Sequence, residues 1–196
     1  MPKLAVLASG SGSNFEALVR ALEPTEHECV LLICDRAGAG ALERAARLGV
    51  PSRHVSFAGR PRTRAEAEIE ALLTEADADL VALAGFLRIL SPDFVRPRAG
   101  RILNIHPALL PAYPGLDALR RAWDAGEETF GVTIHLVDEG MDTGPILRQK
   151  SLKRRAGESF KDLETRVHAL EHGLYPEVVL GMLYNLSRNG TQGGRP

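Results

Sequence analysis

Short apolar runs alternate with amphipathic stretches along the first half of the chain. Runs this short, apolar at nearly every position, predict strands that are buried on both faces of a sheet. They are KLAVLA (3–8), CVLLIC (29–34), LVALAG (80–85) and RILNIH (101–106). The stretches between them carry apolar residues at helical spacing and predict three helices, over 14–22, 40–49 and 63–76, with Gly49 as a stop signal for the second.

Strand and helix alternate in a way that predicts parallel strands joined by right-handed crossovers. We therefore expect an α/β fold built on a doubly wound, mostly parallel open sheet with a Rossmann-like N-terminal half. Residues 132–138 and 145–152 predict a further hairpin-like pair. Residues 158–186 predict a long helix interrupted near Pro176. We expect residues 1–188 to form a single domain and residues 189–196 a flexible tail, because the chain loses its apolar residues there.

Composition narrows the class of protein. With 24 basic and 25 acidic residues the formal charge is −1, which argues against broad nucleic-acid binding. No apolar run approaches the roughly 20 residues of a membrane span, and the N-terminus does not have the pattern of a signal peptide. Cys29 and Cys34 fall at odd spacing in one expected strand, so their side chains face opposite ways and cannot easily pair. We therefore expect a cytoplasmic protein without a membrane partner.

A glycine-rich loop follows the first expected strand and opens the first helix. Gly10 and Gly12 permit tight turns, while Ser11, Ser13 and Asn14 offer hydroxyl and amide donors. Free N–H groups at a helix N-terminus favour anions, so the loop predicts a site for a terminal phosphate.

Two other interpretations of this loop stay open at this point. Asp35 ends the second strand, about where a dinucleotide-binding domain places its ribose-binding acid, but Phe15 stands where that motif needs a third glycine. The loop could also be a plain turn in which Ser or Asn caps the helix. We favour a monophosphate site over a dinucleotide site.

Asn104 and His106 alternate at the end of a buried strand, so their side chains share one face, and Pro107 stiffens the exit. Asp142 lies in the glycine-containing segment DEGMDTG. Ligands of open parallel sheets bind beyond the carboxyl ends of the strands, where all these segments can meet.

If the three side chains do meet, the carboxylate should raise the pKa of the imidazole and favour imidazolium near neutral pH. Imidazolium and amide N–H groups could then stabilise an oxyanion, with Asp142 orienting the ring and shuttling a proton through water. No G-x-S-x-G occurs, which favours direct transfer over a covalent acyl-enzyme.

Plainer explanations of these residues also exist. A single strand-end His or loop Asp is often structural, and we interpret His135 as a core or supporting histidine. His and Asp can also bind metal, but neither H-E-x-x-H nor C-x-x-C spacing occurs, so we expect no metal. A non-catalytic nucleotide-binding module would explain the glycine loop and leave Asn104, His106 and Asp142 without a role.

Several segments together resemble the folate-dependent phosphoribosylglycinamide formyltransferase family, in the same order and over nearly the whole chain. They are SGSGSNFEAL, LAGFLRILSP, NIHPALLPAYPG, GVTIHLVDEGMDTGPIL and EHGLYP. The resemblance implies transfer of a formyl group from 10-formyltetrahydrofolate, the cosubstrate, to the glycinamide amine of a phosphoribosyl substrate in purine synthesis. It implies a part up to about residue 100 that binds phosphate, and a remainder that is catalytic and binds folate.

The resemblance also implies roles for particular residues. The catalytic residues would be Asn104, His106 and Asp142. The phosphate site would be Ser11, Gly12, Ser13 and Asn14, and the glycinamide site Pro107 and Glu171. Folate would contact Arg62, Leu87, Arg88, Ile89, Leu90, Asn104, Val137, Asp138, Glu139, Gly140 and Met141, with Arg60 and Arg64 as alternatives to Arg62.

Related folate enzymes are the nearest alternatives. A formyltetrahydrofolate deformylase is expected to carry an N-terminal regulatory domain, and a methionyl-tRNA formyltransferase a basic C-terminal RNA-binding domain. We expect neither domain here. We therefore expect small-molecule substrates as the only partners, with no nucleic acid, in a monomer or a homodimer.

Overall fold

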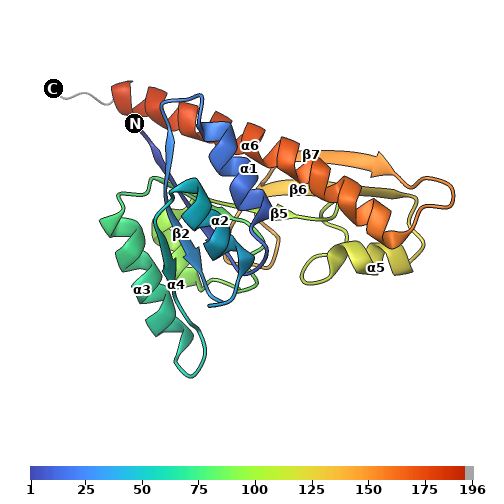
Figure 1. The fold of residues 1–196 in the computed structure, drawn as a ribbon, viewed down its shortest axis with the longest axis horizontal. Helices are drawn as coiled ribbons and strands as arrows, with labels where there is room; N and C mark the ends of the chain where they lie inside the picture. The colour runs from blue at the N-terminus through green and yellow to red at the C-terminus, as the bar shows by residue number, and fades with distance from the viewer. Residues whose placement is uncertain (193–196) are drawn as a thin grey trace.

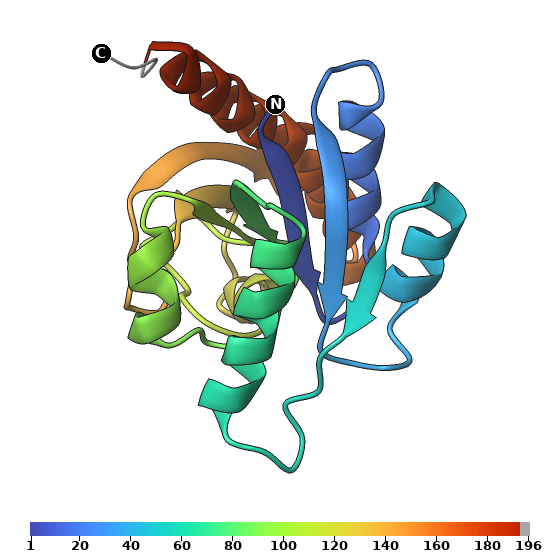
Figure 2. The same cartoon turned by 90° about the vertical axis from the view of Figure 1, so that its left-hand side faces the viewer.

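A seven-stranded sheet forms the centre of the molecule, with helices on both of its faces (Figure 1 and Figure 2). The computed structural model describes residues 1–192. The strand order is β3-β2-β1-β4-β5-β6-β7. The strands are β1 (Lys3–Ala8), β2 (Glu28–Cys34), β3 (Ser52–His54), β4 (Leu80–Leu83), β5 (Ile102–His106), β6 (Thr129–Leu136) and β7 (Ile146–Lys153).

The first five strands are parallel, and β6 and β7 are antiparallel to their neighbours. The predicted doubly wound, mostly parallel open sheet is therefore confirmed, as is the hairpin-like pair at its end. The helices are α1 (Ser13–Leu22), α2 (Gly40–Leu48), α3 (Arg62–Glu75), α4 (Pro92–Val95), α5 (Ala118–Asp124) and α6 (Phe160–Gln192), with a 3-10 turn at Arg96–Arg98.

Two apolar cores lie on opposite faces of the sheet. Alternate residues of β1 divide between them, because successive side chains of a strand point to opposite faces. Leu4 and Val6 pack in the core that α1, α2, α5 and α6 cover, while Ala5 and Leu7 face α3 and α4. Both layers leave the carboxyl ends of the parallel strands free to carry the loops of a site.

The predicted break near Pro176 is wrong, because helix α6 continues through this residue. A proline inside a helix removes one hydrogen bond and clashes with the preceding turn. Here the neighbouring Tyr175 is fully buried, and its hydroxyl donates to the carbonyl oxygens of Leu83 (3.0 Å) and Leu103 (3.2 Å). Packing of α6 on the sheet and on α1 thus outweighs the local cost of the proline (Figure 1).

The C-terminal end also differs from the prediction. Helix α6 continues to Gln192, so residues 189–192 are helical, where the sequence predicts a flexible tail. The rest of the expected tail, residues 193–196, lies outside the described residues. Strand β3, helices α4 and α5 and the 3-10 turn were not predicted, because each is too short to show a period.

Other expectations concern the chain as a whole. Cys29 and Cys34 both lie in β2 and are free thiols. Within residues 1–192, no helix combines the length and the apolar character that crossing a membrane requires.

Candidate active site

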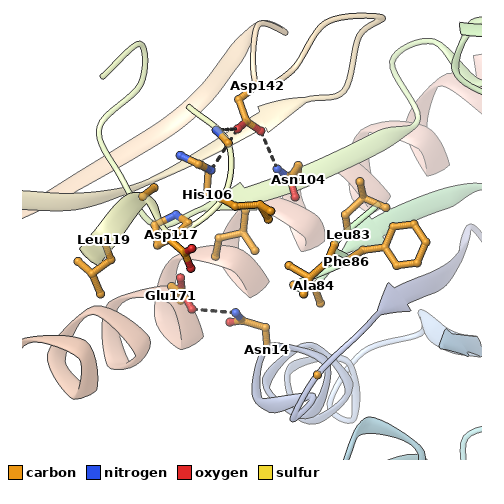
Figure 3. Close-up of a pocket in the computed structure, with 18 of the residues that line it drawn as sticks. Asn14, Leu83, Ala84, Phe86, Asn104, His106, Asp117, Leu119, Asp142 and Glu171 are labelled. Atoms are coloured by element: carbon orange, nitrogen blue, oxygen red, sulfur yellow. Dashed lines mark hydrogen bonds and ion pairs between the residues drawn. The ribbon is translucent and has the colours of Figure 1, made fainter. Parts of the chain in front are cut away.

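One cavity of about 630 Å³ opens at the carboxyl ends of β1, β4 and β5. Its walls are the glycine loop, the loop after β4, the end of β5, the loop after β6 and one side of α6. The parallel order predicts that the first three of these segments meet, and the structure brings the loop after β6 and one side of α6 to the same cavity. Figure 3 shows Asn104, His106 and Asp142 grouped in one part of the cavity and Asn14 with Glu171 in another.

Asp142 lies in contact with both Asn104 and His106. Asn104 Nδ2 donates to Asp142 Oδ1 at 3.3 Å, and His106 Nδ1 lies 3.4 Å from Asp142 Oδ2. Strand β5 supplies the first two residues, and the loop between β6 and β7 supplies the carboxylate. The carboxylate therefore reaches both side chains at once.

The other nitrogen of the His106 ring determines its tautomer. Nε2 lies 2.8 Å from the carbonyl oxygen of Tyr113, which can only accept, so Nε2 carries a proton. This leaves Nδ1 facing Asp142. In the neutral ring Nδ1 has no proton to donate, so a short hydrogen bond to the carboxylate requires the imidazolium form.

The expected rise in the pKa of His106 is wrong. Burial lowers the pKa of this imidazole below its usual value, and this outweighs the opposite effects of the Tyr113 carbonyl and the Asp142 carboxylate. The side chain is only 5% exposed, so the charged form loses most of its hydration. His135 and Arg121, both cationic when protonated, lower the pKa further.

The pKa of Asp142 is also lowered, to about 2, which for a carboxyl group favours the charged form. The contact with His135 is the largest cause, followed among the stabilising groups by the Gly115 amide, which donates to Oδ2 at 2.8 Å. Asp142 therefore remains ionised at any working pH. Its backbone is in the left-handed region, with φ of 56°, and this turns the carboxylate toward β5.

His135 supports the group from the neighbouring strand. It pairs with Asn104 in the β5–β6 register and is 2% exposed. Its Nδ1 lies 2.8 Å from the Leu136 carbonyl oxygen, and its Nε2 lies 3.2 Å from Asn104 Nδ2 and 3.5 Å from Asp142 Oδ1. The interpretation of His135 as a core or supporting residue agrees with this position.

The glycine loop brings backbone amides to the start of α1. Gly12 is the N-cap residue, with φ of 78° and no side-chain cap, so the alternative of a plain Ser or Asn cap is wrong. A Cβ at Gly12 would lie 2.6 Å from Ala41 Cα, so only glycine lets α1 and α2 approach this closely. Uncapped N–H groups at the rim of a cavity are available to an anion.

Asn14 and Glu171 join α1 to α6 across the floor of the cavity, where Asn14 Nδ2 donates to Glu171 Oε2 at 2.8 Å. Burial raises the pKa of Glu171, although the Asn14 amide opposes this. The buried Asn14 Oδ1 has no hydrogen-bond partner among the described residues. Pro107, the other residue expected to contact glycinamide, also lines the cavity.

The alternative of a dinucleotide site depends on Asp35 as the acid that binds a ribose, and Asp35 is not available for this. The side chain of Asp35 is 1% exposed and accepts a 2.6 Å hydrogen bond from Arg88 Nε, and Asp35 does not line the cavity. Phe15 is fully buried in the core under α1. The acid at the end of β2 therefore fixes the loop after β4 and is not placed to hold a ribose.

Most of the residues expected to contact folate line the cavity. They are Leu87, Arg88, Ile89, Leu90, Asn104, Val137, Asp138, Gly140 and Met141. Three of them, Leu87, Ile89 and Met141, expose large apolar side chains at 48%, 60% and 50%, which is unusual without a ligand to cover them.

Two of the expected folate residues are not brought to the cavity. Glu139 does not line the cavity and accepts two hydrogen bonds from Arg96, at 2.6 and 2.9 Å. Arg62 lies at the start of α3, with Nε 3.7 Å from Glu66 Oε1, and does not line the cavity. Arg60, one of its alternatives, pairs with Glu68 at 2.6 Å.

Sequence reasoning missed the contribution of the segment after β5 and of the first turns of α6. Leu116, Asp117, Phe160, Glu164 and His168 also line the cavity. The helical spacing of His168 and Glu171 puts both on one side of α6, which is a signal that the sequence did contain. Among the described residues, no group of three or more His, Cys, Asp or Glu could hold a metal ion.

Comparison with known proteins shows which family has this sequence and this fold. A family model described as "Formyl transferase" matches residues 2–179. A phosphoribosylglycinamide formyltransferase of Bacillus subtilis is 42% identical, over 93% of this chain and 95% of its own length. One from Escherichia coli is 41% identical, over 90% and 84%. The crystal structure of glycinamide ribonucleotide transformylase 1 from Geobacillus kaustophilus superimposes with a TM-score of 0.89, at 46% identity, over 93% of this chain and 99% of that one.

Proposed function

This chain belongs to the phosphoribosylglycinamide formyltransferase family, and from that premise we propose that it transfers a formyl group from 10-formyltetrahydrofolate to the glycinamide amine of N1-(5-phospho-D-ribosyl)glycinamide. The reaction is a step of de novo purine (IMP) biosynthesis. One observation carries the chemical part of the proposal: a single cavity combines an anion-binding type of loop, exposed apolar side chains, and the group of Asn104, His106 and Asp142.

The ribonucleotide fits the part of the cavity formed by α1 and α6. Its phosphate would accept hydrogen bonds from the backbone of residues 11–13, where the N-terminus of α1 lacks a side-chain cap. Glu171 would accept from the glycinamide amine. These contacts hold the nucleophile near β5 without any covalent bond to the enzyme.

The folate fits the part that has exposed apolar side chains. Leu87, Ile89 and Met141 would cover the pterin and benzoyl rings, and the backbone around Val137 to Asp142 would contact the edge of the pterin. Burial of apolar area contributes about 25 cal/mol per Å² to such binding. The formyl group at N10 would then lie against Asn104 and His106.

The reaction requires one bond to form and one to break. The amine attacks the formyl carbon, a tetrahedral oxyanion forms, and the bond from this carbon to the folate N10 then breaks. The proton lost by the amine passes to N10, through water held by Asp142. Holding both substrates in line can contribute roughly 7–11 kcal/mol, and a well-placed oxyanion donor about 3 kcal/mol.

The contacts made without substrate indicate how Asn104 and His106 would come to bind the oxyanion. The Asn104–Asp142 and His106–Asp142 contacts, at 3.3 and 3.4 Å, are longer than the 2.8 Å contact of His106 with Tyr113. Longer hydrogen bonds are weaker, so Asn104 and His106 lose less free energy when they release Asp142 and bind the formyl oxygen. Because the protonated ring is the form that stabilises an oxyanion, and burial lowers its pKa, turnover should fall as the pH rises through this pKa.

The test is a two-substrate assay. The purified protein is mixed with 10-formyl-5,8-dideazafolate and glycinamide ribonucleotide, each substrate is omitted in turn, and the change in absorbance is followed. Turnover that requires both substrates supports the proposal. Turnover without the ribonucleotide would instead identify a deformylase, and binding of the ribonucleotide without turnover would identify a non-catalytic binding module.

The roles of the residues are tested in the same assay. We expect His106→Ala to lose most of kcat while both substrates still bind. Near-normal turnover of this variant would rule out the proposed role of His106.

A further inference from the structure

The short segment from Tyr113 to Gly115 holds both His106 and Asp142. The Tyr113 carbonyl accepts from His106 Nε2 at 2.8 Å, and the Gly115 amide donates to Asp142 Oδ2 at 2.8 Å. The distance between the imidazole and the carboxylate thus depends on where this segment lies.

The backbone of this segment is not in a relaxed conformation. Tyr113 has φ of 56°, in the left-handed region that aromatic residues rarely adopt. A conformation of this kind persists only where surrounding contacts hold it. The question is which contacts do so.

Packing behind the segment is incomplete. A second cavity of about 210 Å³ lies between this segment and the start of β6, lined by Pro107, Tyr113, Glu127 and Phe130 among others. Side-chain packing on this side of the segment is therefore not continuous. Polar contacts must therefore supply part of the restraint.

Two side chains from the α5–β6 connection and from α5 supply such contacts. The Tyr113 hydroxyl donates to Glu127 Oε1 at 2.7 Å. Arg121 Nη1 donates to the carbonyl oxygens of Pro114 (2.6 Å) and Leu116 (3.3 Å), and the guanidinium carbon lies 5.8 Å from the centre of the Tyr113 ring. Glu127 is the acceptor that holds the tyrosine side chain.

We propose that Glu127 is a positioning residue, which acts through the Tyr113 hydroxyl to hold the carbonyl oxygen that orients His106. Glu127 does not line the main cavity and touches no reacting atom, so it does not act as a catalytic residue. The carboxylate also raises the pKa of the Tyr113 phenol, which keeps the hydroxyl protonated and able to donate. The inference rests on the proposed function, because its effect is measured on that reaction.

The hydrogen bond from His106 to the Tyr113 carbonyl affects the pKa of His106. The groups facing this ring are Asp142, His135 and Arg121, together with the Tyr113 carbonyl. The carbonyl raises the pKa of His106, so loss of the carbonyl contact should lower that pKa further. The limb of the kcat profile on which activity falls with rising pH should then move to lower pH.

The experiment is a double-mutant cycle of Tyr113→Phe and Glu127→Ala in the two-substrate assay. We expect each single variant to lower kcat about five-fold, to leave both KM values within about two-fold, and to move that limb to lower pH. The double variant should be no worse than either single one, because both changes remove the same hydrogen bond. Glu127→Gln keeps an acceptor oxygen at the same reach and should recover most of kcat.

The matched control is Glu128→Ala, an exposed neighbour whose side chain makes no hydrogen bond or ion pair among the residues described. It should leave kcat and the pH profile unchanged. Multiplicative losses in the double variant, a higher KM with unchanged kcat, or lower thermal stability with an unmoved pH profile would each overturn the inference. A wild-type protein with no turnover would instead contradict the proposed function itself, so the two failures are distinguishable.

Discussion

His106 Nδ1 lies 3.4 Å from Asp142 Oδ2, although the two residues come from β5 and from the loop between β6 and β7. The aspartate has a pKa of about 2 and remains ionised, whereas burial lowers the pKa of the histidine. Asp142 therefore carries a permanent negative charge, whereas protonation of the His106 ring is less favourable than it would be in water. The pH dependence of catalysis should therefore depend on the charge of Asp142.

Asp142→Asn should lower kcat by about 10²-fold, a typical loss when a group that assists proton transfer is removed. The Asp142 carboxylate raises the pKa of His106, so an uncharged side chain of the same shape should let that pKa fall further. Because the protonated ring is the active form, the limb on which activity declines should move to lower pH. Steady-state kcat measured from pH 5 to 9 checks both effects.

Asp124→Asn is the control for this change, because Asp124 is exposed on α5 and does not line the cavity. Its kcat profile should match the wild type. An Asp142→Asn profile that is lower but not displaced would show that the carboxylate does not influence the titration of His106.

Gly12→Ala should weaken ribonucleotide binding without affecting the folate. The new Cβ would lie 2.6 Å from Ala41 Cα, and the backbone there has φ of 78°, so either α2 or the loop must move. We expect KM for the ribonucleotide to rise about ten-fold or more and KM for the formyl donor to stay within two-fold. Steady-state titration of each substrate gives both values.

Gly10→Ala provides a close comparison in the same loop. Its Cβ would meet nothing within 4 Å, so the loop should keep its shape and KM for the ribonucleotide should rise less than in Gly12→Ala. Equal effects of the two alanines would show that the phosphate does not depend on the backbone conformation at Gly12.

Tyr175→Phe should destabilise the fold by about 1–3 kcal/mol, the cost of leaving a buried polar group without its partner. The Tyr175 hydroxyl donates to the Leu83 and Leu103 carbonyl oxygens, so it ties α6 to the ends of β4 and β5. Urea denaturation followed by circular dichroism measures the free energy of unfolding. Tyr184→Phe changes a side chain that is 52% exposed and should alter this free energy by less than about 0.5 kcal/mol.

The sequence by itself determined the sheet and the place of the site. Apolar runs and helical spacing are local, so they predicted the main strands and three helices, and alternation of the two predicted parallel order. The carboxyl ends of neighbouring parallel strands lie at one edge of the sheet, which predicted that Asn104 and His106 lie near the glycine loop. The meeting of Asp142 with them was a supposition supported by the family resemblance, because β6, which precedes Asp142, runs antiparallel to β5. His135 pairs with Asn104 across β5 and β6, which only the register of the strands shows.

The tertiary structure decided what depends on burial and on distant packing. The pKa of His106 is lowered because the ring is desolvated, an effect that a neighbouring carboxylate in the sequence cannot reveal. Helix α6 continues through Pro176 because its buried face packs on the sheet. In each case the deciding interactions join residues far apart in the chain, or depend on how much water reaches them, and neither quantity is present in the local pattern of the sequence.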